Sequence, residues 1–285
     1  MKYGLRYGVD TCARQGIIET HILPLNGIPM ATTPSDVSAA NERCGIFLQR
    51  VSKSYNTVRA LNDITLHFSN ARTTAIVGTS GCGKSTLLKT VNGLVIPDSG
   101  QLLVNGETFT PANQLRLRRR MGYCVQHIGL FPHLTLKDNI TLLAKLEKQS
   151  PEKINTRLQL LLSTCELEQD LLKRYPHQVS GGQQQRAGLC RALMLNPEFL
   201  LLDEAFGAVD PITRVDIHRQ FKQLQQLEQR TILLVTHDIR EALLLADDIV
   251  TMHNGTIVNV KTANEYQACD DPEQTLLDQI RHAHA

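Results

Sequence analysis

One short segment constrains this chain more than any other, the run Gly78-Thr79-Ser80-Gly81-Cys82-Gly83-Lys84-Ser85, which fits G-x-x-x-x-G-K-[ST]. Glycines let backbone N–H groups curl around phosphate oxygens, and a helix N-terminus favours anions. The apolar stretch TTAIV precedes the run and the helical stretch STLLKTVNGL follows it, as a phosphate-binding loop requires. A plain glycine turn is the alternative. We predict a nucleotide site with Lys84 on the outer phosphates and the Ser85 hydroxyl on Mg²⁺.

A second element is an apolar strand that ends in two acidic residues, Phe199-Leu200-Leu201-Leu202-Asp203-Glu204. Four successive apolar residues indicate a strand buried on both faces. In open α/β sheets, ligands bind at the carboxyl ends of the strands, where this strand places its carboxylates. Such residues are often only solvated, but beside a phosphate loop Asp203 is expected to hold the metal and Glu204 to orient the attacking water.

A third element opens a helix with Ser180-Gly181-Gly182-Gln183. Ser180 is a good N-cap, and the glycines let a phosphate approach the backbone. A capped helix without further role is the other interpretation. The chain has two helix N-termini suited to phosphate but only one phosphate-loop lysine, Lys84. We therefore predict a head-to-tail homodimer, in which each nucleotide is bound by the phosphate loop of one subunit and covered by the Ser180 segment of the other.

The pattern of short strands and helices from about residue 45 onward predicts an α/β fold. Asn105-Gly106 and Asn254-Gly255 stand between apolar runs and predict hairpins. Helices are expected after Asp210-Pro211 and again after the strand TILLV, where Ile239, Ala242, Leu243 and Ala246 repeat with helical spacing. Strand candidates disappear over about 127–195. We therefore expect a mixed β-sheet core around the phosphate loop, an N-terminal antiparallel β part and an inserted α-helical subdomain.

Composition excludes several classes of protein. The chain has 42% hydrophobic residues, which argues against a disordered chain. Its 30 Lys+Arg against 28 Asp+Glu give a formal net charge of +2, too small a positive charge to suggest nucleic acid as the main partner. The seven cysteines form no C-x-x-C pair, and His282 and His284 are too sparse for a metal site. No window approaches 18 successive apolar residues, so we expect a soluble, cytoplasmic protein. We interpret Arg116, Arg118, Arg119 and Arg120 as the exposed end of a helix.

The three elements, in this order and spacing, resemble the ATP-binding subunits of ABC transporters. The resemblance covers residues 45 to about 260 and implies an ATPase that uses ATP and Mg²⁺. It implies ATP contacts at Tyr55, Gly78, Thr79, Ser80, Gly81, Cys82, Gly83, Lys84, Ser85, Thr86 and Gln126. Tyr55 is expected to stack on the adenine, and Gln126, the Q-loop residue, to join the metal shell and sense the membrane partner. Taken alone, Tyr55 is more often a packing residue.

The same resemblance assigns further roles. It implies that Lys84, Glu204 and His237 are catalytic, with His237 as the switch histidine, and that Ser85, Gln126 and Asp203 hold Mg²⁺. Ser180, Gly181, Gly182 and Gln183 correspond to the signature that reaches the opposite subunit's ATP, and Asp210 belongs to the D-loop. Outside this context, His237 after a buried strand is more often a satisfied polar residue. Val179, Gly207 and Val209 depart from the usual residues without removing a functional group.

Longer stretches, such as GYCVQHIGLFPHLTLKDNI, look most like importer ATPases for glycine betaine, choline and related osmoprotectants. This implies a peripheral position on the cytoplasmic side of the cell membrane, permease subunits that dock near Phe131 and Pro132, and an indirect link to a substrate-binding protein. An importer for another small solute, or a soluble ABC ATPase without a transport role, is the alternative. Many relatives carry C-terminal CBS domains, which the 25 residues after Val260 do not accommodate.

We divide the chain into three parts. Residues 1–43, with the polar stretch ATTPSDVSAANER, are expected to form a flexible extension. Residues 44–262 form the ABC-type ATP-binding domain, and 263–285 a short tail with one helix candidate, DPEQTLLDQIRH. Translation starting at Met30 is a further hypothesis, which the intact mass of the natively expressed protein tests; a product that retains Met1 contradicts it.

Overall fold

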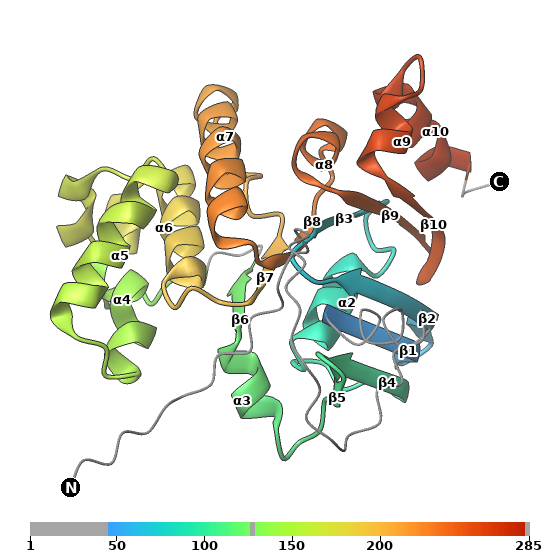
Figure 1. Ribbon diagram of the computed structural model, residues 1–285, viewed down its shortest axis with the longest axis horizontal. Helices are drawn as coiled ribbons and strands as arrows, with labels where there is room; N and C mark the ends of the chain where they lie inside the picture. Colours follow the sequence, from blue (N-terminus) through green and yellow to red (C-terminus); the bar gives the residue numbers. More distant parts are fainter. Residues whose placement is uncertain (1–44, 126–128, 283–285) are drawn as a thin grey trace, which may run out of the picture.

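Two β-sheets form the centre of the molecule in the computed structural model, which describes residues 45–125 and 129–282 (Figure 1). Sheet A is antiparallel, with the order β2-β1-β4-β5. Its strands are β1 (Gly45–Tyr55), β2 (Val58–Ser69), β4 (Ser99–Val104) and β5 (Glu107–Thr108).

Sheet B has the order β10-β9-β3-β8-β7-β6. Its strands are β3 (Thr73–Gly78), β6 (Met121–Cys124), β7 (Phe199–Asp203), β8 (Thr231–Val235), β9 (Asp248–His253) and β10 (Thr256–Thr262). The strands from β9 to β6 run parallel, whereas β10 is antiparallel to β9. The predicted mixed sheet and antiparallel part are confirmed.

Both predicted hairpins are present because their Asn-Gly pairs adopt the required backbone conformation. Asn105 and Gly106 have φ angles of 48° and 76°, and Asn254 and Gly255 have 44° and 76°. Positive φ at both central residues matches the right-handed twist of the flanking strands. These turns join β4 to β5 and β9 to β10.

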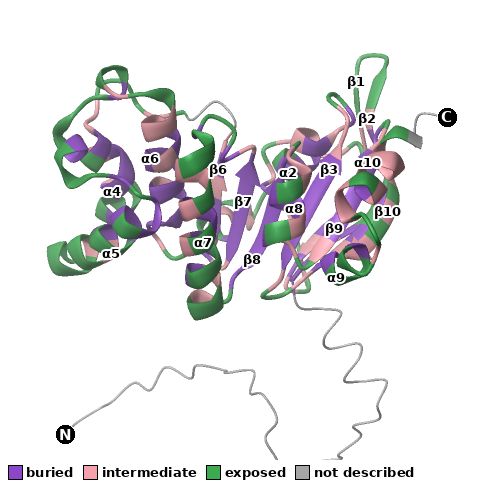
Figure 2. Cartoon of the chain, turned by 90° about the horizontal axis from the view of Figure 1, so that it is seen from above, coloured by how far each residue is buried: buried purple, intermediate pink, exposed green. Residues whose placement is uncertain are grey.

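The strands β3, β7 and β8 of sheet B are buried on both faces, as Figure 2 shows by their purple colour between flanking helices. In β7, Phe199 and Leu201 pack toward sheet A and α2 (Lys84–Val91), whereas Leu200 and Leu202 pack toward the helices of the opposite face. This double burial explains the continuous apolar runs in β7 and β8. It also fixes the carboxyl ends of these strands beside the phosphate loop.

A helical region follows the gap at 126–128 and lies to one side of sheet B (Figure 1). It contains α4 (Leu136–Leu146), α5 (Pro151–Thr164) and α6 (Gly181–Leu193), with short 3-10 helices at Gln169–Lys173 and Pro176–Gln178. The hydroxyls of Thr135 and Ser150 cap α4 and α5 by accepting the N–H groups of Asp138 and Lys153. The predicted inserted helices are therefore present.

The remaining helices are α3 (Gln114–Arg119), α7 (Pro211–Glu228), α8 (Ile239–Leu245), α9 (Ala263–Gln267) and α10 (Pro272–His282). Asp210 caps α7 by accepting the Thr213 N–H at 2.9 Å, as predicted. Helix α8 ends before Ala246, which has an extended ψ of 150°, so the predicted helical repeat is one residue too long. Helices α9 and α10 pack onto sheet B through buried Tyr266 and Leu276.

The arginine cluster lies at the end of α3, as predicted. Its members are used within the fold: Arg116 pairs with Glu107, Arg118 donates to the carbonyls of Asn92 and Gly93, Arg119 pairs with Glu147, and Arg120 pairs with Glu198. Within the described ranges, none of the helices combines the length and the apolar character needed to cross a bilayer. The proposed division into 1–43, 44–262 and 263–285 stays a prediction, and 1–44 lie outside the described residues.

Candidate nucleotide site

The phosphate loop joins β3 to α2 and lines a cleft of about 530 Å³. The lining combines the loop with β2 and the ends of β7 and β8, through Ala60, Gly78, Ser80, Gly81, Gly83, Lys84, Ser85, Thr86, Glu204 and His237. Ala60 was not anticipated from the sequence. The cleft therefore brings together nine residues of the predicted site, from segments more than 100 positions apart.

The loop depends on glycine at Gly83. Its φ of 108° lies in the region that favours glycine, and a Cβ at this position would lie 2.3 Å from the carbonyl oxygen of Ala60. The adjacent Lys84 is largely buried, and its Nζ donates to the carbonyls of Gly78 and Thr79 at 2.8 Å each. Cys82 is buried below the loop, with its Sγ 3.7 Å from Lys84 Nζ. The loop thus holds a cation close to its own backbone.

Ser85, which lines the cleft, contacts the buried side chain of Asp203. The Ser85 hydroxyl donates to Asp203 Oδ1 at 3.0 Å, although the two residues are 118 positions apart. Burial of the carboxyl, with the neighbouring charge of Glu204, raises the pKa of Asp203. The Tyr123 side chain on the adjacent strand β6 lies near Asp203, and burial also raises its pKa. A bound cation would reduce the cost of carrying negative charge on Asp203 and Glu204.

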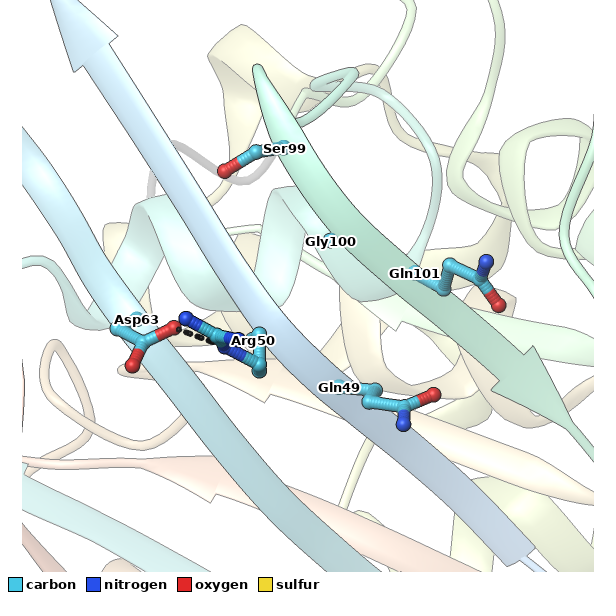
Figure 3. Close-up of a pocket in the computed structure, with 6 residues that line it drawn as sticks. All are labelled: Gln49, Arg50, Asp63, Ser99, Gly100 and Gln101. Atoms are coloured by element: carbon cyan, nitrogen blue, oxygen red, sulfur yellow. Dashed lines mark hydrogen bonds and ion pairs between the residues drawn. The ribbon is translucent and has the colours of Figure 1, made fainter.

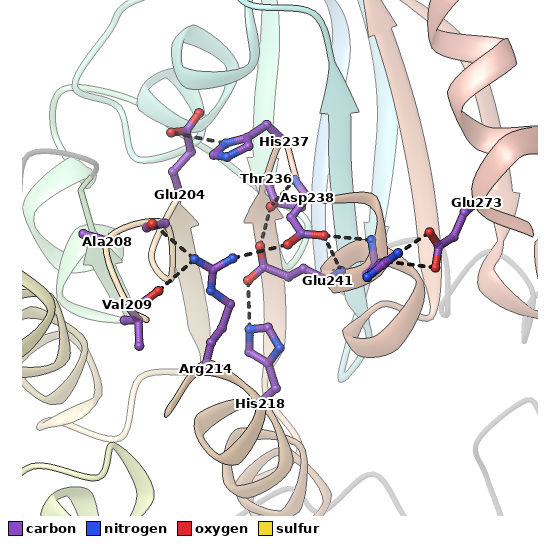
Figure 4. A network of polar contacts seen from close by, with 12 residues as sticks. Glu204, Ala208, Val209, Arg214, His218, Thr236, His237, Asp238, Glu241 and Glu273 are labelled. Atoms are coloured by element: carbon purple, nitrogen blue, oxygen red, sulfur yellow. Dashed lines mark hydrogen bonds and ion pairs between the residues drawn. The ribbon is translucent and has the colours of Figure 1, made fainter. Parts of the chain in front are cut away.

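Glu204 follows the strand in a left-handed backbone conformation, with φ of 51°. Its N–H donates to the carbonyl of Val235 at 2.9 Å, which fixes the residue to the end of β8. The His237 Nδ1 lies 3.6 Å from Glu204 Oε2, and the two side chains face each other in Figure 4. Backbone strain at a non-glycine residue beside a cleft is typical of functional positions. Two of the predicted catalytic side chains are therefore adjacent.

The signature segment begins α6 with a reciprocal capping box. Ser180 Oγ accepts the Gln183 N–H at 3.2 Å, and Gln183 Oε1 accepts the Ser180 N–H at 2.9 Å. Ser180, Gly181, Gly182 and Gln183 do not line the cleft of the phosphate loop in their own chain. A Cβ at Gly181 would meet open space. The segment is therefore presented outward rather than toward its own Lys84.

Gln185 is a site residue that the sequence did not reveal. Its Nε2 donates to the Glu204 carbonyl at 2.8 Å, and its Oε1 accepts the Ala208 N–H at 2.7 Å. Because Gln185 is buried on α6, it ties the signature helix to the end of β7 and to the D-loop, residues 207–210. It stands inside a run of three glutamines, where nothing in the pattern distinguished it from its neighbours.

Other predicted positions lie apart from the cleft. Tyr55 is 46% exposed at the end of β1, with Lys53 Nζ 5.8 Å from its ring centre, and does not line the cleft. Asp210 is engaged as the cap of α7. Gln126 lies outside the described residues, so its predicted role is not placed.

A further hollow on sheet A, of about 380 Å³, carries no converging groups (Figure 3). Its charged residues, Arg50 and Asp63, pair with each other at 3.2 Å and are well exposed. It contains none of the residues that the motifs indicate. In the described part of the chain, no cluster of three or more His, Cys, Asp or Glu side chains has the arrangement of a metal site.

Comparisons with known proteins agree with this geometry. The family model described as ABC transporter matches residues 61–207. The chain is 47% identical over 213 residues to the glycine betaine uptake system ATP-binding protein YehX of Escherichia coli (strain K12), covering 75% of this chain and 69% of that protein. It is 45% identical over 219 residues to the glycine betaine/carnitine/choline transport ATP-binding protein OpuCA of Bacillus subtilis (strain 168), covering 76% of this chain and 58% of that protein.

The fold also matches a solved structure, the dimeric post-hydrolysis state of the ATP-binding cassette MJ0796 bound to ADP and Pi. The TM-score is 0.72 at 29% identity, and the match covers 76% of this chain and 98% of that one. The family model spans the phosphate loop, the signature segment and the Asp203-Glu204 pair. The chain therefore belongs to the ABC transporter family, as an ATP-binding protein with the ATPase fold of that family.

Proposed function

We propose that this chain is the ATP-hydrolysing subunit of an importer for glycine betaine, choline or a similar quaternary-amine osmoprotectant. The observation that carries the ATPase part is the single cleft that contains Lys84, Ser85, Glu204 and His237. The osmoprotectant part is supported by the relatives, which include uptake proteins for glycine betaine and for carnitine and choline. The match covers 69% and 58% of these two relatives, so we extend their substrates to this chain as a proposal.

Each cleft residue has a role that its position supports. The loop N–H groups and Lys84 bind the phosphates, because the Lys84 ammonium already lies at the loop backbone. Glu204 orients the attacking water and accepts its proton, and His237 contacts the γ-phosphate from the facing side. Tyr55, which does not line the cleft, is proposed to stack on the adenine through its exposed ring at the end of β1.

The donor groups of the cleft fit Mg²⁺. The Ser85 hydroxyl and the Asp203 carboxylate lie 3.0 Å apart, and Mg²⁺ is usually bound by one or two protein oxygens together with phosphates and water. Bound Mg²⁺ would neutralise charge on the β- and γ-phosphates. The raised pKa of Asp203 means that its charged form is unfavourable without a nearby cation, which fits a role as a metal ligand. Gln126 is proposed as a third ligand from the resemblance alone.

We propose further that two copies of the chain act as a head-to-tail homodimer. The signature residues Ser180, Gly181, Gly182 and Gln183 face away from their own phosphate loop, so a second subunit is needed to bring them to a nucleotide. A similar cassette has been solved as a dimer. Ser180 and Gly182 of one subunit would then complete the phosphate shell of the other.

The membrane partner would dock on the cytoplasmic side, near Phe131. This side chain is exposed, and its backbone is held by buried Asn139, which accepts the Phe131 N–H at 2.7 Å and donates to the Phe131 carbonyl at 3.0 Å. A firmly held apolar residue is suited to receive a helix of a permease. A substrate-binding protein would contact the permease and not this chain.

Uptake measurements test the proposal. In cells deleted for this gene, the parent gene should restore accumulation of radiolabelled glycine betaine or choline, whereas Glu204→Gln should not. Sulfate uptake serves as the control for an unrelated solute. Restored uptake of sulfate without any quaternary amine would contradict the assignment of the solute, and normal uptake of every solute in the deleted cells would contradict a transport role.

A further inference from the structure

A buried hydroxyl contacts both the segment that carries His237 and helix α8. Thr236 is buried at the end of β8, and its Oγ1 accepts the Asp238 N–H at 3.0 Å. The same hydroxyl donates its hydrogen to Glu241 Oε2 (Figure 4). His237 lies between Thr236 and Asp238, so its backbone direction depends on a hydroxyl whose orientation Glu241 sets.

Glu241 in turn faces a buried histidine. Its second oxygen, Oε1, lies 3.3 Å from His218 Nε2, and the side chains of Glu241 and His218 are only 5% and 6% exposed. Apart from this approach, neither of these two atoms has a hydrogen-bond partner among the described residues. Phe206 holds the imidazole edge to face, with 4.9 Å between ring centres and an interplanar angle of 86°. The pair is therefore fixed from both sides.

A second connection reaches the same segment from one turn earlier on α7. Arg214 Nη1 lies 3.3 Å from Asp238 Oδ2, and Arg214 Nη2 donates to the carbonyls of Val209 at 2.8 Å and Gly207 at 3.3 Å. Residues 214 and 218 are four positions apart and share one face of the helix. Helix α7 thus joins the D-loop to both flanks of His237.

Packing alone does not account for this arrangement. An apolar pair of similar volume fills such a space without the cost of removing a carboxylate from water. A polar pair placed behind a cleft residue and linked to it through one hydroxyl instead restricts the orientation of that residue. The geometry directs this restriction at His237, whose own side chain is two-thirds exposed to the cleft.

We propose that His218 and Glu241 are positioning residues of the ATPase: acting through Thr236, they fix the direction in which His237 faces the γ-phosphate. Neither residue touches the nucleotide. The inference rests on the proposed role of His237. It predicts that disturbing the pair slows turnover more than it weakens ATP binding.

Three variants and one control test the pair. His218→Phe keeps a ring against Phe206 but removes the nitrogen, Glu241→Gln keeps the shape and an acceptor for Thr236, and the third variant combines both. Glu273→Gln is the matched control, because this carboxylate lies on α10, pairs with Arg240 and is well exposed. The measurements are kcat and KM for Mg-ATP, and the melting temperature.

Each single variant should lower kcat about tenfold, equivalent to about 1.4 kcal/mol, with a KM close to that of the parent. The melting temperature should also fall, because each change leaves a buried polar atom without its partner. The double variant should be no slower than the slower single variant, since both residues act through one contact chain. His218→Gln, which restores a nitrogen donor, should recover part of the kcat lost in His218→Phe. The control should match the parent.

Several results would overturn the inference. One is a kcat within about twofold of the parent in both single variants, because turnover would then not depend on the buried pair. Another is a parallel fall of kcat, melting temperature and ATP affinity, which indicates a structural role only. If the losses of kcat in the two single variants multiply in the double variant, the two residues act independently, which contradicts a shared path through Thr236. If the parent itself shows no Mg-dependent hydrolysis, the proposed function fails, a result distinct from the others.

Discussion

Replacing Glu228 by glutamine should destabilise the protein because two buried arginines share this carboxylate. Arg157 on α5 binds it with both terminal nitrogens, and Arg230, just before β8, binds it from the other side. The side chains of Arg157, Glu228 and Arg230 are 14%, 16% and 2% exposed. Burial lowers the pKa of Arg230 to about 10, which reflects the cost of keeping this cation from water. Arg157 also donates to the Leu193 carbonyl at 2.9 Å, so the cluster joins α5, α6 and α7.

In Glu228→Gln the two guanidinium groups face each other without their shared counter-charge. Removing one partner of a buried pair costs about 3 to 5 kcal/mol, so we expect a loss of about 3 kcal/mol in the free energy of unfolding, because Glu228 retains slight contact with water. Urea unfolding followed by circular dichroism measures this loss, with Glu273→Gln as the exposed control. A loss below about 1 kcal/mol, or one equal to that of the control, would refute the reasoning, since exposed pairs contribute little.

Three further substitutions have defined outcomes. Asp203→Asn should abolish turnover and raise the melting temperature at pH 7, because burial raises the pKa of Asp203 and makes its charged form unfavourable in the folded protein. The gain in melting temperature should shrink as the pH falls through that pKa, since the parent carboxyl then becomes neutral. A constant gain from pH 7 to pH 4 would contradict the raised pKa. Asn139→Leu should lose about 2 to 3 kcal/mol in urea unfolding and speed proteolytic cleavage near Phe131, since the buried amide bonds that segment at 2.7–3.1 Å; unchanged cleavage would argue against this. Gly83→Ala should remove ATP binding in a titration without unfolding the chain, because its Cβ would meet the Ala60 carbonyl, and parent-like affinity would contradict the geometry.

The sequence contained enough local information to predict the strands and the phosphate loop. The apolar runs of β7 and β8 and the Asn-Gly turns are set by neighbouring residues, and they are present as predicted. The motifs predicted that Ser85 and Asp203 both bind the metal, because they place both residues at one edge of the sheet. The direct hydrogen bond between these residues, which are 118 positions apart, was not predicted.

Other features depend on tertiary contacts that no short pattern encodes. Gln185 and the His218–Glu241 pair have partners on other elements, and each stands in an ordinary helical stretch. The end of α8 is set by the extended backbone of Ala246, which the helical spacing of its apolar residues did not predict. Helix α9 is short and begins with a capping box at Thr262, so its apolar pattern is too brief to identify.

Glu204 is the proposed base of the ATP-hydrolysing cleft. The most direct test compares purified parent and Glu204→Gln by ATP titration and by phosphate release in the presence of Mg²⁺. If Glu204 is the base, the two proteins should bind ATP with similar affinity, and turnover by the variant should be lower by about a hundredfold or more, the size expected when a general base is removed. Phosphate release by Glu204→Gln near the parent rate would contradict it.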